Sequence, residues 1–197
     1  MEHELVINKN DASSVDVVVA CLEKEYAMVL PCDTIYGLSA VVGNAGQALL
    51  RTIKGRSADK AFLVLATLDM ARSLAGGTLP VGLEQVWPAP LTAIITLPHG
   101  GTLAIRVPED SFIQEVLRRL GRPIYSTSVN KSGEKAMVSF DEIFAHYGMD
   151  ENVSLFVIGP SLQPSMPSTI IDCTVEPYHL VRQGAFDATA LIQASSK

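Results

Sequence analysis

Short apolar segments rich in valine and isoleucine recur along the 197-residue chain, and stretches with helical spacing separate most of them. Segments of this length and composition are typical of buried β-strands. They predict strands at Glu4–Ile7, Ala27–Pro31, Ala61–Ala66, Leu91–Leu97, Thr102–Val107, Ile124–Thr127, Leu155–Ile158, Thr169–Cys173 and His179–Arg182.

The intervening segments open at or near a small polar residue, as helices do. In the first of them, Ser13 or Ser14 is a suitable N-cap, and Val15, Val18 and Leu22 follow along one face. The predicted helices cover Ser13–Glu25, Ala45–Lys54, Leu68–Ala75, Ser111–Leu120, Ser139–Tyr147 and Thr189–Ala194. Two of the predicted strands lie within Leu91–Val107, which leaves no room for a helical crossover and favours a mixed sheet. The pattern predicts a single α/β domain over residues 1–197, with a twisted mixed β-sheet and flanking helices.

Composition is consistent with an ordinary folded domain. Hydrophobic residues make up 48% and charged residues 18% of the chain, which is enough apolar material for a core. No apolar run approaches the roughly 20 residues that span a bilayer. The first four residues carry acids where a signal peptide carries bases, and three widely spaced cysteines do not form a disulfide framework or a zinc site. We expect a cytoplasmic protein with no membrane association.

The net charge of −6 argues against broad binding of nucleic acid, yet the cations are unevenly placed. A first basic group contains Arg51, Lys54, Arg56 and Lys60, opposed only by Asp59. A second basic group contains Arg118, Arg119, Arg122, Lys131 and Lys135. Local basic groups in an acidic protein favour a compact anion as ligand. The alternative is that each group is a solvated helix face.

Common catalytic motifs are absent from the sequence. It contains no Gly-x-x-x-x-Gly-Lys loop, no Gly-x-Gly-x-x-Gly, no Gly-x-Ser-x-Gly and no His-Glu-x-x-His. The four histidines never pair at metal-ligand spacing, so no metal ligand is identified among the side chains. An enzyme of this kind would act by positioning its substrates and stabilising charge, as in phosphoryl transfer.

Three polar segments are candidates for such a site. Pro31–Leu38 is a strand that breaks into a turn of small polar residues, among them Thr34. Lys54 and Arg56 flank Gly55, a natural helix C-cap, and Lys60 follows in a loop, so that three cations can converge. The alternatives are a plain turn and cations that merely offset the helix dipole.

The third segment, Ser126–Asn130, places hydroxyls at a strand end. With a period of two, Ser126, Ser128 and Asn130 would share one face, with Thr127 and Val129 on the other. Arg106, at the end of an apolar strand, must either emerge or be paired, because an unpaired buried charge is prohibitive. Trp87 precedes a proline-rich entry to a strand. Its position is equally compatible with burial in the core and with direct contact to a ligand.

In this order, the three segments resemble the motifs of the YrdC-like threonylcarbamoyl-adenylate synthases, over about residues 26–184. The family motifs are proline-threonine-acid-threonine, lysine-x-arginine and serine-x-asparagine, which build one cavity. Pro167–Asp172 and Leu180–Gly184 match the C-terminal pair of that family, in which a serine and an arginine complete the nucleotide site. The chain departs from the family at five positions: Cys32, Ser57, Ala61, Ala89 and Val129.

The resemblance implies a YrdC/RibB-like fold around a basic cleft and synthesis of L-threonylcarbamoyladenylate. The substrates would be L-threonine, bicarbonate or CO2, and ATP with Mg²⁺, and pyrophosphate would be released. The product would pass to a transferase that modifies adenosine 37 of tRNA, with possible contact to RNA. The implied ATP and phosphate contacts are Lys54, Arg56, Lys60, Ser128, Asn130, Ser168 and Arg182. The implied threonine contacts are Thr34, Arg106 and Ser126.

No side chain is expected to act as a covalent nucleophile. The main alternative is a paralogue of the same fold that binds RNA or nucleotide without synthase activity, and the five departures keep it open. A carbamoyl-transfer module is disfavoured, because the chain lacks the zinc-finger and acylphosphatase-like segments that accompany such modules.

Overall fold

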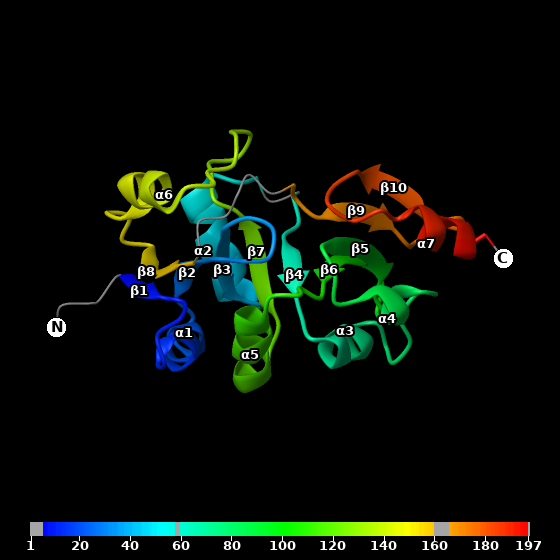
Figure 1. Ribbon diagram of the computed structural model, residues 1–197, viewed down its shortest axis with the longest axis horizontal. Helices are drawn as coiled ribbons and strands as arrows, with labels where there is room; N and C mark the ends of the chain where they lie inside the picture. Colours follow the sequence, from blue (N-terminus) through cyan, green and yellow to red (C-terminus); the bar gives the residue numbers. More distant parts are fainter. Residues whose placement is uncertain (1–5, 58–59, 160–165, 197) are drawn as a thin grey trace.

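A continuous sheet of ten strands runs through residues 6–57, 60–159 and 166–196, which the computed structural model describes (Figure 1). The strands are β1 (Val6–Asn8), β2 (Ala27–Leu30), β3 (Gly37–Val41), β4 (Leu63–Leu65), β5 (Leu91–Thr96), β6 (Thr102–Arg106), β7 (Ile124–Ser128), β8 (Val153–Ile158), β9 (Thr169–Asp172) and β10 (His179–Arg182). Their spatial order is β1-β8-β2-β3-β7-β4-β6-β5-β9-β10.

The sheet mixes parallel and antiparallel ladders. The pairs β1–β8, β2–β8, β4–β6 and β5–β9 are parallel, and β2–β3, β3–β7, β4–β7, β5–β6 and β9–β10 are antiparallel. The predicted mixed α/β fold is therefore confirmed. The β5–β6 hairpin is the pair for which the sequence left no room for a crossover.

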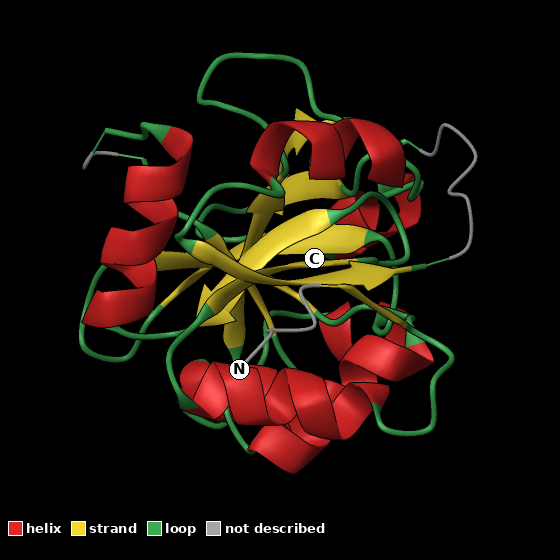
Figure 2. Ribbon diagram, turned by 90° about the vertical axis from the view of Figure 1, so that its left-hand side faces the viewer, coloured by secondary structure: helices red, strands yellow, loops and turns green. Residues whose placement is uncertain are grey.

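Helices cover both faces of the sheet (Figure 2). They are α1 (Ser14–Glu23), α2 (Asn44–Lys54), α3 (Leu68–Leu74), α4 (Leu83–Val86), α5 (Ser111–Leu120), α6 (Phe140–Tyr147) and α7 (Thr189–Ala194). Helices α1 and α5 pack together over one core, with Leu22 and Leu117 among its buried residues, and α2 and α6 pack over another, with Leu50 and Ile143. A third core lies among β5, β6 and β9 and includes Leu191 of α7.

Helix α5 shows how local sequence fixes an element. Asp110 caps its start, because its Oδ1 accepts hydrogen bonds from the backbone N–H groups of Phe112 and Ile113 at 3.0 and 3.1 Å. Gly121 ends it with φ 66°, a left-handed conformation that favours glycine. Between the caps, one face buries five apolar side chains in the first core, each worth roughly 1.5–3 kcal/mol when fully buried.

Two elements differ from the sequence prediction. Strand β3 was not predicted, because Gly37 and Leu38 were assigned to the end of a turn and Ser39–Val41 to no element. Gly37, Ser39 and Ala40 are weak strand formers, yet every residue of β3 is buried between β2 and β7. Helix α4 was missed because it has only four residues. Part of the first predicted strand, Glu4 and Leu5, lies outside the described residues. The extent of a single domain over residues 1–197 stays a prediction.

Within the described ranges, the helices are all too short or too polar to cross a membrane. Trp87 is buried in the third core, where its indole N–H donates to the Leu91 carbonyl at 2.9 Å. The core interpretation of Trp87 is thereby confirmed.

Candidate active site

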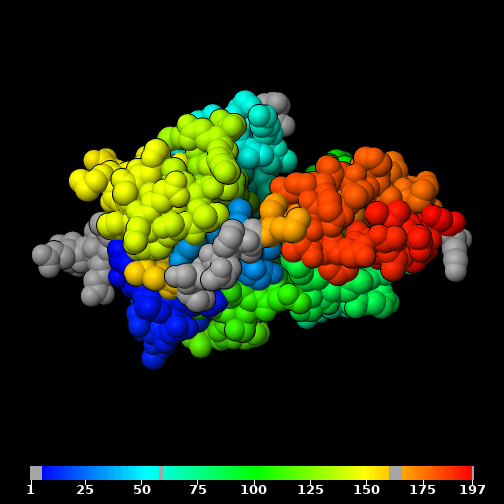
Figure 3. Space-filling model, turned by 45° about the horizontal axis from the view of Figure 1, so that its top comes forward, coloured from blue at the N-terminus to red at the C-terminus, as the bar shows by residue number. Residues whose placement is uncertain are grey.

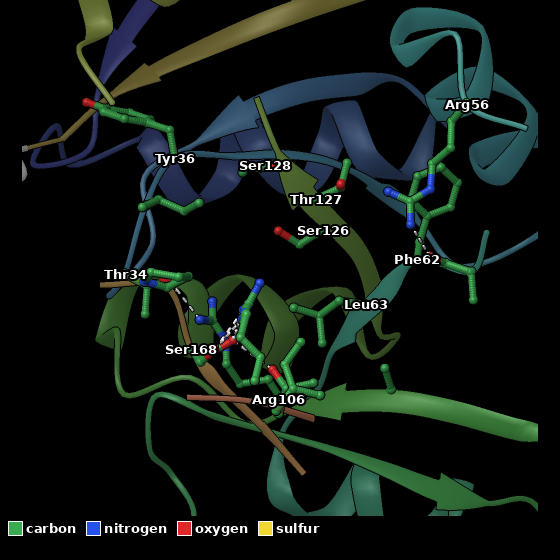
Figure 4. Close-up of a pocket in the computed structure, with 18 residues that line it drawn as sticks. Thr34, Tyr36, Arg56, Phe62, Leu63, Arg106, Ser126, Thr127, Ser128 and Ser168 are labelled. Carbon is green, nitrogen blue, oxygen red and sulfur yellow. Dashed lines mark hydrogen bonds between the residues drawn. The ribbon is translucent and has the colours of Figure 1, made fainter. Parts of the chain in front are cut away.

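A cavity of about 310 Å³ lies where the middle strands of the sheet meet the turn before β3 and the loop after α2 (Figure 4). Both the β3–β7 side and the β5–β6–β9–β10 side of the sheet contribute to it. The residues that line it are Thr34, Ile35, Tyr36, Gly37, Arg56, Ala61, Phe62, Leu63, Thr92, Ala104, Arg106, Ser126, Thr127, Ser128, Pro167, Ser168, Ile170 and Arg182.

Most of the predicted site residues meet at this cavity although they are far apart in the sequence. Those that line it are Thr34, Arg56, Arg106, Ser126, Ser128, Ser168 and Arg182. The lining includes three arginines and, among the described residues, no aspartate or glutamate. A concave surface with this charge and several hydroxyls suits an anionic, oxygen-rich ligand.

Arg106 is held at the base of the cavity by three consecutive residues of the turn after β2. Its Nη1 donates to Thr34 Oγ1 at 2.8 Å, its Nη2 donates to Cys32 Sγ at 2.9 Å, and Nη2 lies 3.2 Å from Asp33 Oδ1. The residue is only 3% exposed. The sequence required Arg106 either to emerge or to be paired, and the structure pairs it with Asp33.

Arg182 reaches the same cavity from the edge strand β10. Its Nη2 donates to the Ser168 carbonyl at 2.7 Å, and the Ser168 hydroxyl lies 2.9 Å from Thr92 Oγ1. Desolvation, and then the charge of Arg106, lower the pKa of Arg182. Two like charges this close together favour the binding of anions at this end of the cavity.

Arg56 approaches from a different wall (Figure 4). Gly55 ends α2 with φ 60°, and this left-handed turn directs the chain away from the helix toward the cavity. The Arg56 guanidinium carbon lies 4.9 Å from the centre of the Phe62 ring, and Nη2 donates to the Ala61 carbonyl at 2.7 Å. A cation–π contact of this kind helps to orient the guanidinium.

The hydroxyls of β7 form the centre of the site. Ser126 lies between the Arg56 wall and the Arg106 base (Figure 4). A Cβ added to Gly37, on the neighbouring strand, would stand 2.4 Å from Ser126 Oγ, so any larger residue here would displace the Ser126 hydroxyl. Thr127 also lines the cavity together with Ser126 and Ser128, although the strand alternation of β7 places its side chain on the other face.

Three predicted contacts, Lys54, Lys60 and Asn130, do not line the cavity. Lys54 is 2% exposed, and its Nζ donates to the Ser128 carbonyl at 2.6 Å, the Asn130 carbonyl at 2.9 Å and Asn130 Oδ1 at 2.8 Å. All three ammonium donors therefore hold the turn after β7. Burial, then the charges of Arg56 and Lys131, lower the pKa of Lys54 to about 8.

Asn130 belongs to the same turn, and its Oδ1 also accepts from the Ser128 hydroxyl at 2.7 Å. Lys60 is exposed at the start of the described segment that leads to β4. Direct phosphate contacts of Lys54, Lys60 and Asn130 stay predictions.

Two members of the second basic group, Arg118 and Arg119, lie on a solvated helix face. Arg118 and Arg119 of α5 both pair with Glu115, and Arg119 also reaches Asp16 of α1. These exposed pairs neutralise the arginines, and neither arginine lies at the cavity.

Sequence reasoning gave no role to two residues that line the cavity, Thr92 and Tyr36. Thr92 stands in the proline-rich segment after Trp87 and pairs with Ser168 across β5 and β9. Tyr36 Oη accepts a hydrogen bond from the Gly159 backbone N–H at 3.0 Å. Only their proximity to recognised motifs could have identified them.

The five departures leave the arginines of the cavity in place. Cys32 does not line the cavity and contacts Arg106 from behind, while Ala61 lines it and accepts from Arg56 through its carbonyl. Ala89 and Val129 are buried in apolar cores. The Ser57 carbonyl accepts a hydrogen bond from Arg51.

Comparison with known proteins agrees with this geometry. The profile of the Sua5/YciO/YrdC family, described as "Telomere recombination", matches residues 20–184. The chain belongs to this family. A curated relative from Vibrio vulnificus, named threonylcarbamoyl-AMP synthase, is 29% identical over 192 residues, covering 87% of this chain and 99% of its own length.

Two solved structures show that the fold is that of Sua5 and YciO. Sua5 of P. abyssi, crystallised with L-threonine, has a TM-score of 0.83 and 22% identity. The match covers 95% of this chain and 60% of the longer Sua5 chain. YciO of E. coli has a TM-score of 0.78 and 21% identity, covering 94% of this chain and 96% of its own. The Sua5/YciO/YrdC fold predicted from the sequence motifs is thus confirmed.

Within the part of the chain that the structure describes, no three histidine, cysteine, aspartate or glutamate side chains are grouped so that they could hold a metal ion. Asp33, which precedes Thr34 of the cavity lining, is paired with Arg106.

Proposed function

We propose that the protein is a threonylcarbamoyl-AMP synthase, a nucleotidyltransferase that uses L-threonine, bicarbonate or CO2, and ATP. The observation that carries this proposal is the single cavity in which Arg56, Arg106 and Arg182 meet the hydroxyls of Ser126 and Ser128 without any described carboxylate in its wall. The names of the curated relatives support it. The product would serve a transferase that modifies adenosine 37 of tRNA.

The reaction joins a carbamate to the nucleotide. The amino group of threonine reacts with bicarbonate, releasing water, or with CO2, releasing a proton, and a C–N bond forms to give a carbamate. A carbamate oxygen then attacks the α-phosphorus of ATP. A new P–O bond forms as the bond to the β-phosphate oxygen breaks, and pyrophosphate leaves with the electron pair. The protein supplies alignment and positive charge, and no side chain is needed as a nucleophile.

The two ends of the cavity suggest how the substrates divide it. Arg106, Thr34 and Ser126 lie together and would orient the carboxylate and hydroxyl of threonine. Arg56 on the opposite wall would hold the triphosphate, because a guanidinium can grip two phosphate oxygens. Ser128, Ser168 and Arg182 would complete the nucleotide site, with Lys60 at its entrance.

Mg²⁺ would enter with ATP. The ion prefers oxygen ligands and keeps several waters, and in nucleotide sites phosphates provide much of its coordination. This arrangement fits a cavity rich in cations and hydroxyls and poor in carboxylates, since the cation would neutralise phosphates that the arginines leave uncontacted.

The test is direct. The purified protein is incubated with ATP, Mg²⁺, bicarbonate and labelled L-threonine, and adenylate and pyrophosphate are measured together. Equal amounts of both products, dependent on threonine, support the proposal. Pyrophosphate without labelled adenylate, or RNA binding with neither product, would favour the paralogue that lacks synthase activity.

A further inference from the structure

Cys32 stands at one of the five positions where the chain departs from its family, and it contacts the site without lining it. The side chain follows the buried strand β2 and is 3% exposed. Its Sγ lies 2.9 Å from Arg106 Nη2 and 3.1 Å from Asp33 Oδ1. The thiol is thus placed between the two partners of an ion pair.

The direction of these two hydrogen bonds is fixed by protonation. Burial is the largest influence on the thiol and raises the pKa of Cys32 to about 12, so the group keeps its proton at neutral pH. The S–H therefore donates to Asp33, and a sulfur lone pair accepts from Arg106. The thiol adds no charge, and it links the carboxylate to the guanidinium.

The guanidinium has few other restraints. Nη1 has Thr34 and Nη2 has Cys32 and Asp33, while Nε is buried and has no hydrogen-bond partner among the described residues. Asp33 is itself anchored, because its Oδ2 accepts from the backbone N–H of Glu109 at 3.2 Å. The turn at 32–34 therefore holds one edge of Arg106, while Nε is a buried donor that these residues leave unsatisfied.

We propose that Cys32 is a positioning residue for the amino-acid substrate: its sulfur fixes the Arg106 guanidinium in the orientation that receives the L-threonine carboxylate. This role rests on the proposed function only in naming L-threonine as the ligand. Loss of the sulfur acceptor leaves Nη2 with Asp33 alone, and the guanidinium becomes free to tilt toward that carboxylate. Threonine binding then weakens, whereas ATP, gripped on the Arg56 wall, is little affected.

The test uses four variants and one control. Cys32→Ala removes the acceptor, Cys32→Val removes it but keeps a side chain of similar bulk, and Cys32→Ser and Cys32→Thr restore an oxygen acceptor. Cys21→Ala, in α1 away from the cavity, is the control. Calorimetry measures the Kd of L-threonine and of a non-hydrolysable ATP analogue, and thermal melting reports stability.

We expect Cys32→Ala and Cys32→Val to raise the Kd of L-threonine about tenfold, about 1.4 kcal/mol, with the Kd of the ATP analogue within about twofold. Cys32→Ser and Cys32→Thr should recover most of the loss. In ¹H–¹⁵N spectra, the Arg106 Nε–H signal should broaden or shift in the alanine and valine variants and return in the threonine variant. Equal behaviour of the valine and threonine variants would overturn the proposal.

A parallel loss of threonine and ATP affinity together with a lowered Tm would also overturn it, because that pattern indicates general damage to the fold. The binding and spectral measurements do not require turnover. If the wild-type protein binds L-threonine but makes no adenylate, the synthase proposal fails while the role of Cys32 is still decided by the variants. If the wild-type protein binds no L-threonine, the role assigned to Cys32 is wrong.

Discussion

Replacing Lys54 by methionine tests which of two roles its ammonium has. It either binds phosphate directly or holds the turn at 128–130, which carries proposed nucleotide contacts. The three hydrogen bonds from its ammonium to the turn at 128–130 are each worth about 1.5–3 kcal/mol, as is usual for charged donors. Burial of the charge opposes them, and the lowering of the pKa from 10.5 to about 8 corresponds to about 3 kcal/mol. We expect Lys54→Met to reduce the free energy of unfolding by about 2–5 kcal/mol.

Urea unfolding of the wild type, Lys54→Met and Lys131→Met measures this difference. Lys131 is the matched control, because it comes from the same region but makes one described hydrogen bond, from Nζ to the Ile53 carbonyl at 2.7 Å. Lys131 is only half-buried, so water can replace this bond, and its loss should cost about 1 kcal/mol or less. The free energy of unfolding of Lys54→Met could instead lie within about 0.5 kcal/mol of that of the wild type. If ATP affinity nevertheless falls tenfold or more, Lys54 does not act by holding the turn and contacts phosphate directly.

The pH dependence of stability provides a second check on Lys54. Because its pKa in the native protein, about 8, lies below the value of 10.5 for the free side chain, the unfolded chain holds more protons between these pH values. The contribution of Lys54 to the free energy of unfolding therefore rises with pH across that window and is flat below it. Subtracting the curve of Lys54→Met from that of the wild type isolates this contribution.

Three further predictions concern the cavity itself. Arg56→Ala should raise the Kd of ATP about 10- to 100-fold while the Tm falls by only a few degrees; calorimetry showing unchanged ATP affinity would contradict the phosphate assignment. Gly37→Ala should weaken threonine binding about tenfold, because its new Cβ would stand 2.4 Å from Ser126 Oγ. The double variant Gly37→Ala/Ser126→Ala should bind threonine no more weakly than either single variant, since both changes act on one hydroxyl. Additive losses of affinity would show that Ser126 is not the affected group. Adenylate formation should survive a zinc-selective chelator and require added Mg²⁺; restoration by zinc alone would contradict the expected metal.

Much of the architecture was predictable because apolar periodicity and capping residues agree along most of the chain. The limits of α5 match the prediction from Ser111 to Leu120, since Asp110 and Gly121 mark both ends. Strand β3 was missed for the opposite reason. Its residues have weak intrinsic preference for a strand and are held there by pairing with β2 and β7, which no local pattern reveals.

The site was predictable in its membership more than in its geometry. The resemblance to the family motifs implied that Arg56, Arg106 and Ser126 belong to one cavity, which charge and turn chemistry alone left open. The path of a long side chain depends on tertiary packing, however, so Lys54 could not be seen to turn beneath the cavity wall instead of into it. Likewise, strand alternation alone gave Thr127 no place at the cavity, whereas the structure includes it in the lining beside Ser126 and Ser128.

The shortness of β4 has a mechanical consequence. This strand of three residues joins the β7 side of the sheet to the β6 side, and β4–β6 has two paired positions, the fewest of any ladder among the described residues. Bending stress across the sheet therefore concentrates at Val64 and Leu65, the paired residues of β4. Arg106 of β6 and Ser126 of β7 stand on opposite sides of the short β4–β6 ladder. We expect a small change of twist there to alter the distance between them, and with it the width of the cavity.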